Sequence, residues 1–170
     1  MIVASLLQDL SQPEYVHVLI NPLPVYGLAI GVLALVISLF QRSRTAQVTA
    51  LLLIVVCGAI AWPVAHYGGE AYDRVLSLSD DQGQDWLKAH AERADRFIGY
   101  FYALAAIAVS AVLIPLRWPK AALSLTIISL LCACAVLGMG GYIAYAGGKI
   151  RHREFRNEPA PVIPVEQDEH

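Results

Sequence analysis

FIGYFYALAAIAVSAVLIPL, residues 97–116, contains no Asp, Glu, Lys, Arg or His. A helix needs about 20 predominantly apolar residues to cross the roughly 30 Å of hydrocarbon in a bilayer, and this stretch is long enough to do so. Because lipid offers the backbone no hydrogen-bond partners, a segment of this kind has to be helical. Three further stretches lack the same five residue types: 23–40, 47–65 and 121–146.

The predicted fold class is therefore all-α, a four-helix transmembrane bundle of the up-down antiparallel type. Composition agrees, since 57% of the 170 residues are hydrophobic and 15% are charged, whereas soluble domains carry about 25% charged residues. The net charge of −2 and the lack of a basic stripe argue against nucleic-acid binding, so the lipid bilayer is the predicted partner. The spans are expected, within a membrane domain of residues 1–156, at about 22–40, 47–66, 97–116 and 120–146.

With four spans, the N-terminal segment, the long loop of residues 67–95 and the C-terminal tail share one side of the membrane. The two short turns on the other side contain basic but no acidic residues: Arg42, Arg44, Arg117 and Lys120. Since cytoplasmic loops are enriched in Lys and Arg, we expect a multi-pass protein of the cell (inner) membrane with both termini extracytoplasmic. The Lys and Arg residues after the fourth span argue for the reverse orientation.

The two ends of the chain have distinct character. Residues 1–10 place Ile2, Leu6 and Leu10 on one helical face, which predicts a helix lying along the membrane interface. Segment 157–170 is Pro-rich and acidic and is expected to be disordered. We therefore expect the packed part of the protein to lie between these two segments.

Local signals predict how the first helix begins and where it breaks. Ser11, followed by Pro13 and Glu14, is typical of a capped helix start. Pro22 and Pro24 each lack an N–H and crowd a carbonyl one turn back, so they should kink or interrupt this helix. The first span is thus expected to be irregular near its outer end.

The long loop is predicted to contain an amphipathic helix between the second and third spans. Ser79 is the expected cap, with Gln82 three residues later. The helix is expected to run straight into the third span. Its apolar stripe recurs at helical spacing: Leu87, Ala91, Ala94 and Ile98.

Histidine, tyrosine and tryptophan side chains collect on the side of the termini and long loop. They include four of the five histidines, all eight tyrosines, Trp62 and Trp86. Three interpretations compete: an aromatic belt with ordinary interfacial histidines, a cofactor pocket in that half of the bundle, and a docking surface for a partner subunit. A belt should populate both interfaces, and this cluster is one-sided. Tyr26, beside the prolines of the first helix, belongs to the predicted pocket.

Two ligand sets can be drawn from these residues. His66, Glu70 and Asp73 are spaced i, i+4, i+7, so they would form a ligand stripe for a divalent metal that His90 could complete. A b-type haem needs two axial histidines on facing helices near one side of a bundle. His17, paired with His66 or His90, is the candidate for that arrangement.

Other classes of site find no support in the sequence. No catalytic triad, P-loop, Rossmann glycine pattern or haem-attachment motif is present, so an enzyme is disfavoured. The spans hold no ionisable residue near the bilayer midplane, which disfavours ion-coupled transport. Cys57, Cys132 and Cys134 all fall inside predicted spans and are expected to be inert packing residues.

The first helix, VHVLINPLPVYGL at 16–28, and the end of the fourth, GMGGYIAY at 138–145, resemble an uncharacterised bacterial membrane family, domain of unknown function 2231. His90 before the third span fits the same resemblance. It implies a four-helix membrane protein associated with redox chemistry. The family's histidine positions in the first-helix motif are Asn21 and Tyr26 here, so the resemblance leaves any ligand role to the remaining histidines.

We therefore predict a small polytopic membrane protein, redox-accessory in type, with a haem- or metal-binding site on the His/Tyr-rich side. The alternative is a structural or assembly subunit of a membrane complex, or a homo-oligomer, without a cofactor. Its contacts would be the Gly27/Gly31 pattern, which permits close helix approach, and the amphipathic loop helix.

Overall fold

The computed structural model describes residues 7–161; residues 1–6 and 162–170 lie outside the described part. The predicted interfacial helix of residues 1–10 and the predicted disorder of segment 157–170 therefore fall largely outside it. The α-helices are, in order, α2 (Pro13–Ile20), α3 (Leu28–Phe40), α4 (Arg44–Ala59), α5 (Ala61–Ser77), α6 (Asp81–Arg117) and α7 (Ala122–Arg151). Short helical pieces join or follow them: a π-helix at Leu23–Gly27 and 3-10 helices at Pro119–Ala121 and Arg153–Phe155.

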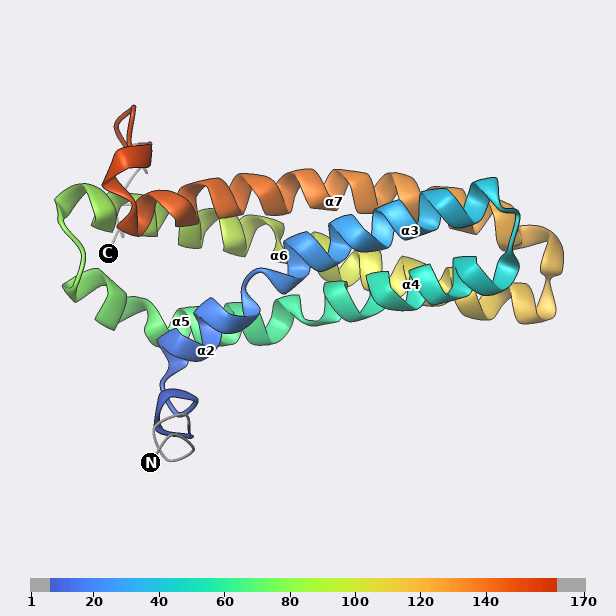
Figure 1. Cartoon of the computed structure of the whole chain (residues 1–170), viewed down its shortest axis with the longest axis horizontal. Coiled ribbons are helices and arrows are strands. Elements are labelled where there is room, and N and C mark those ends of the chain that lie inside the picture. The colour runs from blue at the N-terminus through green and yellow to red at the C-terminus, as the bar shows by residue number, and fades with distance from the viewer. Residues whose placement is uncertain (1–6, 162–170) are drawn as a thin grey trace, which may run out of the picture.

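The predicted all-α, four-helix membrane architecture is confirmed. Four helical segments are long and apolar enough to cross a membrane: Pro13–Phe40, Arg44–Ser77, Asp81–Arg117 and Pro119–Arg151. They run up and down as a bundle, with the described ends of the chain and the α5–α6 turn at the same end (Figure 1). The longest has 37 residues, or about 55 Å at 1.5 Å per residue. It therefore overshoots the roughly 30 Å hydrocarbon layer, and the overshoot lies at the end with the termini.

Neighbouring helices pack in a ring: α3 with α4, α4 with α6, α6 with α7, and α7 with α3. The buried core between them combines large and small apolar side chains, for example Leu35, Ile54, Leu104 and Ala108, each at most 1% exposed. Small residues bring backbones close, as at Gly58, where an added Cβ would lie 2.7 Å from the carbonyl oxygen of Phe101. The apolar residues that remain exposed face outward, as lipid-contacting residues must.

Prolines interrupt the helices at predictable points. A proline cannot donate to the carbonyl four residues before it. Pro24 follows Ile20 by four, and α2 ends at Ile20, which confirms the predicted interruption of the first span. Pro63 follows Ala59 by four, and α4 ends at Ala59.

Pro115 lies inside α6 without ending it. It leaves the carbonyl of Ala111 without its helical N–H, and Arg44 Nη2 donates to that oxygen at 2.7 Å. Arg44 Nη1 also donates to Thr126 Oγ1 at 3.3 Å. One guanidinium thereby ties α4, α6 and α7 together at the end opposite the termini.

The predicted continuity of the loop helix with the third span is confirmed, because α6 runs unbroken from Asp81 through that span. The amphipathic helix is therefore part of α6 and not a distinct element between the second and third spans. Its cap is Asp80 rather than Ser79: Asp80 Oδ1 accepts from Gly83 N at 2.9 Å, while Ser79 Oγ donates to Val75 O at the end of α5. A carboxylate at the cap also interacts favourably with the helix dipole.

The first helix also lacks its predicted cap. Gln12 occupies the capping position of α2 without a side-chain hydrogen bond, and Ser11 instead donates to Gln8 O at 2.6 Å. Pro13 is in the first turn, as expected, where its missing N–H costs nothing.

Candidate cofactor site

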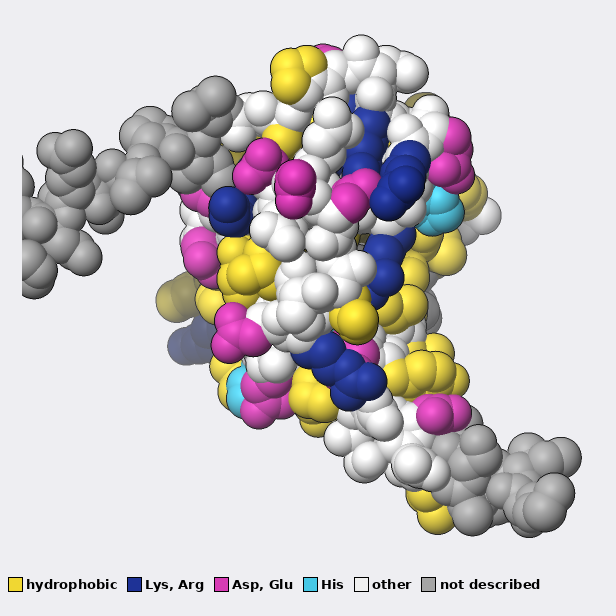
Figure 2. Space-filling view, turned by 90° about the vertical axis from the view of Figure 1, so that its left-hand side faces the viewer, with side chains coloured by type: hydrophobic (Ala, Val, Ile, Leu, Met, Phe, Trp, Pro, Cys, Tyr) yellow, Lys and Arg dark blue, Asp and Glu magenta, His cyan; other side chains and the backbone are white. Residues whose placement is uncertain are grey.

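At the end where the helices overshoot, a cavity of about 980 Å³ lies between the α2–α5 pair and the α6–α7 pair. Its inner part is apolar and includes Pro24, Val25 and Phe101. Its outer part is of mixed charge: it includes the basic residues Arg74 and Arg151 and the acidic residues Glu14, Asp73 and Asp95. Acidic and basic side chains are interspersed over this end of the molecule (Figure 2). The cavity therefore suits a ligand with an apolar body and a polar edge.

His17, on α2, enters this cavity from one side. Its Nδ1 lies 2.8 Å from the carbonyl oxygen of Val64 on α5. The ring passes directly over Gly68, where an added Cβ would lie 2.9 Å from the imidazole Cε1. A carbonyl oxygen can only accept, so Nδ1 carries the proton and Nε2 keeps its lone pair.

His90, on α6, enters from the opposite side. Its Nδ1 lies 3.0 Å from the carbonyl oxygen of Ile143 on α7. The ring lies over Gly147, where an added Cβ would come within 3.1 Å of both Cε1 and Nδ1. The same tautomer follows, with the proton on Nδ1 and a free lone pair on Nε2.

The two imidazoles are neighbours across the bundle. Their ring centroids are 6.5 Å apart and their planes are almost perpendicular, at 82°. Each ring is anchored through Nδ1 to a helix of its own half of the chain, and neither Nδ1 is available to a ligand. Histidine ligands of metals commonly donate their other N–H to a carbonyl in this way, which fixes the ring and raises its basicity.

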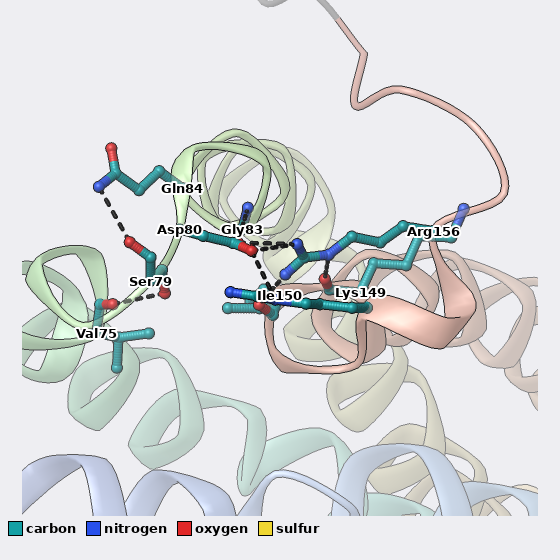
Figure 3. A network of polar contacts seen from close by, with 9 residues as sticks. Val75, Ser79, Asp80, Gly83, Gln84, Lys149, Ile150 and Arg156 are labelled. Atoms are coloured by element: carbon teal, nitrogen blue, oxygen red, sulfur yellow. Dashed lines mark hydrogen bonds and ion pairs between the residues drawn. The ribbon is translucent and has the colours of Figure 1, made fainter.

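A polar network closes the outer end of α6 and α7 (Figure 3). Arg156 Nη1 contacts both Asp80 oxygens at 2.8 and 2.9 Å, and its other nitrogens donate to Lys149 O and Ile150 O. The hydrogen bond from Gly83 N, followed by the Arg156 guanidinium, lowers the pKa of Asp80. One arginine thus caps the C-terminus of α7 and holds the N-cap carboxylate of α6.

A second network lies beside it. Lys149, only 4% exposed, donates to Tyr145 Oη at 2.6 Å and to Glu158 Oε1 at 2.8 Å, and its ammonium lies over the Trp86 ring. The hydrogen bond from Lys149, followed by that from Tyr145, lowers the pKa of Glu158. Trp86 Nε1 is buried and has no hydrogen-bond partner among residues 7–161. Both networks hold the α6–α7 pair together beyond His90.

The other predicted ligands are dispersed. His66 is exposed, stacks on Trp62 and pairs with Glu70 at 3.6 Å, and neither His66 nor Glu70 lines the cavity. Asp73 is exposed on the same helix and lines the outer part of the cavity. Within the described residues, no group of three or more His, Cys, Asp or Glu side chains could hold a metal ion. The metal site built from His66, Glu70, Asp73 and His90 stays a prediction; the histidine beside His90 is His17.

Tyr26 lies on the π-helical segment and is 70% exposed, so it faces away from the core. Sequence reasoning missed the two carbonyls and two glycines that hold the imidazoles. The signal available for them was the set of Gly-Gly pairs toward the outer ends of the second and fourth spans, at 68–69, 140–141 and 147–148.

No protein-family model, curated protein or solved structure matches the chain. Its class therefore follows from its own architecture. Four apolar helices that contact lipid define a small polytopic membrane protein.

Proposed function

We propose that this protein binds a b-type haem between His17 and His90 and serves as a redox-accessory membrane protein. The observation that supports this proposal most directly is the pair of anchored imidazoles, whose ring centroids are 6.5 Å apart. An iron–imidazole bond is about 2 Å long and a ring centroid lies about 1 Å behind its nitrogen, so axial imidazoles of one iron have centroids about 6 Å apart. The observed separation fits that value.

The cavity supports the same proposal. Its volume of about 980 Å³ lies at the upper end of the range of roughly 300–1,000 Å³ for small-molecule and cofactor sites. An apolar inner wall with a charged mouth matches a flat apolar macrocycle with a polar edge. Arg74 at this mouth already pairs with Glu14 at 2.8 Å, so Arg151 is the arginine of the lining that would meet a carboxylate of the macrocycle. With His17 and His90 both holding the iron, no coordination position would stay open, which would favour electron transfer over binding of oxygen.

The depth of the site sets which partners it can meet. His90 precedes the uncharged stretch of α6 by seven residues, or about 10 Å along the helix, so it lies near the headgroups. A soluble electron carrier and a lipid-dissolved one could both approach that level. The basic turns around Arg42 and Lys120 favour an extracytoplasmic location for it.

The assembly-subunit alternative receives less support. Gly27 and Gly31 face inward, since an added Cβ would lie 2.6 Å from Cys57 Sγ and 2.9 Å from Ile54 Cγ1. The close-approach pattern is thus used within the bundle and is not offered to a partner.

The test is haem content of the full chain purified in detergent from a haem-competent host. His17→Ala and His90→Ala should each abolish six-coordinate haem, while His66→Ala, at an exposed histidine of the same end, should leave it unchanged. Equal haem content in all four proteins would refute the assignment. Wild-type protein with stoichiometric zinc or iron and no haem would replace it with a simple metal site.

A further inference from the structure

The two halves of the chain hold their histidines in the same way. In the α2–α5 half, the imidazole contacts the carbonyl of Val64 and lies over Gly68, four residues later. In the α6–α7 half, the imidazole contacts the carbonyl of Ile143 and lies over Gly147, again four residues later. The sequence repeats with the geometry, since 64–69 reads VAHYGG and 143–148 reads IAYAGG.

The spacing of four has a physical reason. In an α-helix, residues i and i+4 lie one above the other, and the carbonyl of residue i points toward the N–H of residue i+4. A ring that donates to that carbonyl from the side must therefore lie against the Cα of residue i+4. A Cβ there would be 2.9 Å from the His17 ring or 3.1 Å from the His90 ring, closer than ordinary contact.

Each repeat supplies its own comparison. The next residues, Gly69 and Gly148, also lie within α5 and α7. An added Cβ would meet nothing within 4 Å at either position among the described residues. Glycine is a poor helix former, and alanine would fit at Gly69 and Gly148 without a clash. Packing therefore does not require glycine at these two positions, as it does at Gly68 and Gly147.

We infer that Gly68 and Gly147 are equivalent positioning residues of a duplicated His–carbonyl–glycine unit, and that they set the orientation of the His17 and His90 imidazoles. This inference rests on the proposed haem site for its functional meaning. The orientation of the rings can nevertheless be measured without the cofactor. Gly68 lies against the His17 ring and Gly147 against the His90 ring, and each acts through that histidine.

The experiment compares Gly68→Ala, Gly147→Ala, Gly69→Ala and Gly148→Ala in the full chain in detergent. The first readout is ¹⁵N NMR of labelled histidine in cofactor-free protein, which reports the Nδ1–H tautomer and its hydrogen bond. We expect Gly68→Ala to perturb only the His17 signal and Gly147→Ala only the His90 signal. The two control variants should match wild type in these signals and melt at the same or a higher temperature, because alanine favours helix.

The second readout is haem binding. Gly68→Ala and Gly147→Ala should each weaken it by about 10- to 100-fold, the usual effect of losing a partner that orients a metal ligand. Both should also raise the high-spin fraction in electron paramagnetic resonance. Unchanged histidine signals in both variants, or equal changes in the controls, would overturn the inference.

The two proposals fail separately. Perturbed histidine signals in protein that binds no haem would retain the positioning role and reject the haem. Normal haem binding by wild type with no effect of either glycine variant would retain the haem and reject the positioning role.

Discussion

Arg44→Ala should destabilise the bundle, because Arg44 on α4 replaces a backbone hydrogen bond that Pro115 removes from α6. Pro115 leaves the Ala111 carbonyl without its helical donor, and Arg44 supplies the replacement at 2.7 Å. Removing the guanidinium leaves a buried carbonyl unsatisfied and removes a charge-assisted hydrogen bond, which together cost about 2–3 kcal/mol. Arg117→Ala, at an exposed arginine of the same end, should cost less than about 0.5 kcal/mol.

A double-mutant cycle isolates this mechanism. Pro115→Ala restores an N–H that can reach the Ala111 carbonyl, so Arg44→Ala in that background should cost about 1–2 kcal/mol less than in wild type. The assay is reversible unfolding of the purified protein in mixed micelles of mild detergent and dodecyl sulfate, followed by circular dichroism. An equal cost of Arg44→Ala in both backgrounds would show that the arginine does not replace the missing donor.

Two further predictions concern the packing of the long helices. Because the pKa of Asp80 is lowered in the fold, its carboxylate stabilises the α6–α7 end at neutral pH, and this contribution is lost as pH falls through that lowered pKa. The protection factor of the Gly83 amide, which corrects its exchange rate for the intrinsic pH dependence of exchange, should fall on acidification in wild type, and an Asp80→Asn variant that keeps the acid-dependent step would contradict this. Gly58→Leu should disrupt the approach of α4 to α6, since even a Cβ would lie 2.7 Å from Phe101 O. The free energy of unfolding should fall by at least about 2 kcal/mol. A melting temperature equal to that of wild type would show that the contact is not close in solution.

The architecture could be predicted from the sequence because its signal is local. Each charge-free stretch, such as 97–116, is sufficient on its own to require a helix across the bilayer. The lengths of those helices were not predictable in the same way. Asp80 and Ser79 are both possible caps of α6 by sequence, and the contact of Asp80 with Arg156, which lies 76 residues away, cannot be read from the local pattern. The Gly27/Gly31 pattern likewise predicts close contact with another helix but does not identify that helix.

The candidate site could be predicted only in part. The one-sided distribution of histidines indicates the correct end of the bundle and includes both members of the central pair. Nothing in the spacing selects His90 over His66 as the neighbour of His17, since that depends on how α2 and α6 face each other across the cavity. His66 lies two residues from Val64, so it points around the helix to an exposed face. The roles of Gly68 and Gly147 require the tertiary contacts as well.

Near-infrared magnetic circular dichroism of the ferric wild-type protein tests the central assignment most directly, because it identifies the axial ligands of a haem. Two neutral imidazoles on a low-spin iron, at one haem per chain, are the predicted result. A protein purified from a haem-replete host without haem, or with a haem whose iron carries only one imidazole, would contradict a site built from His17 and His90.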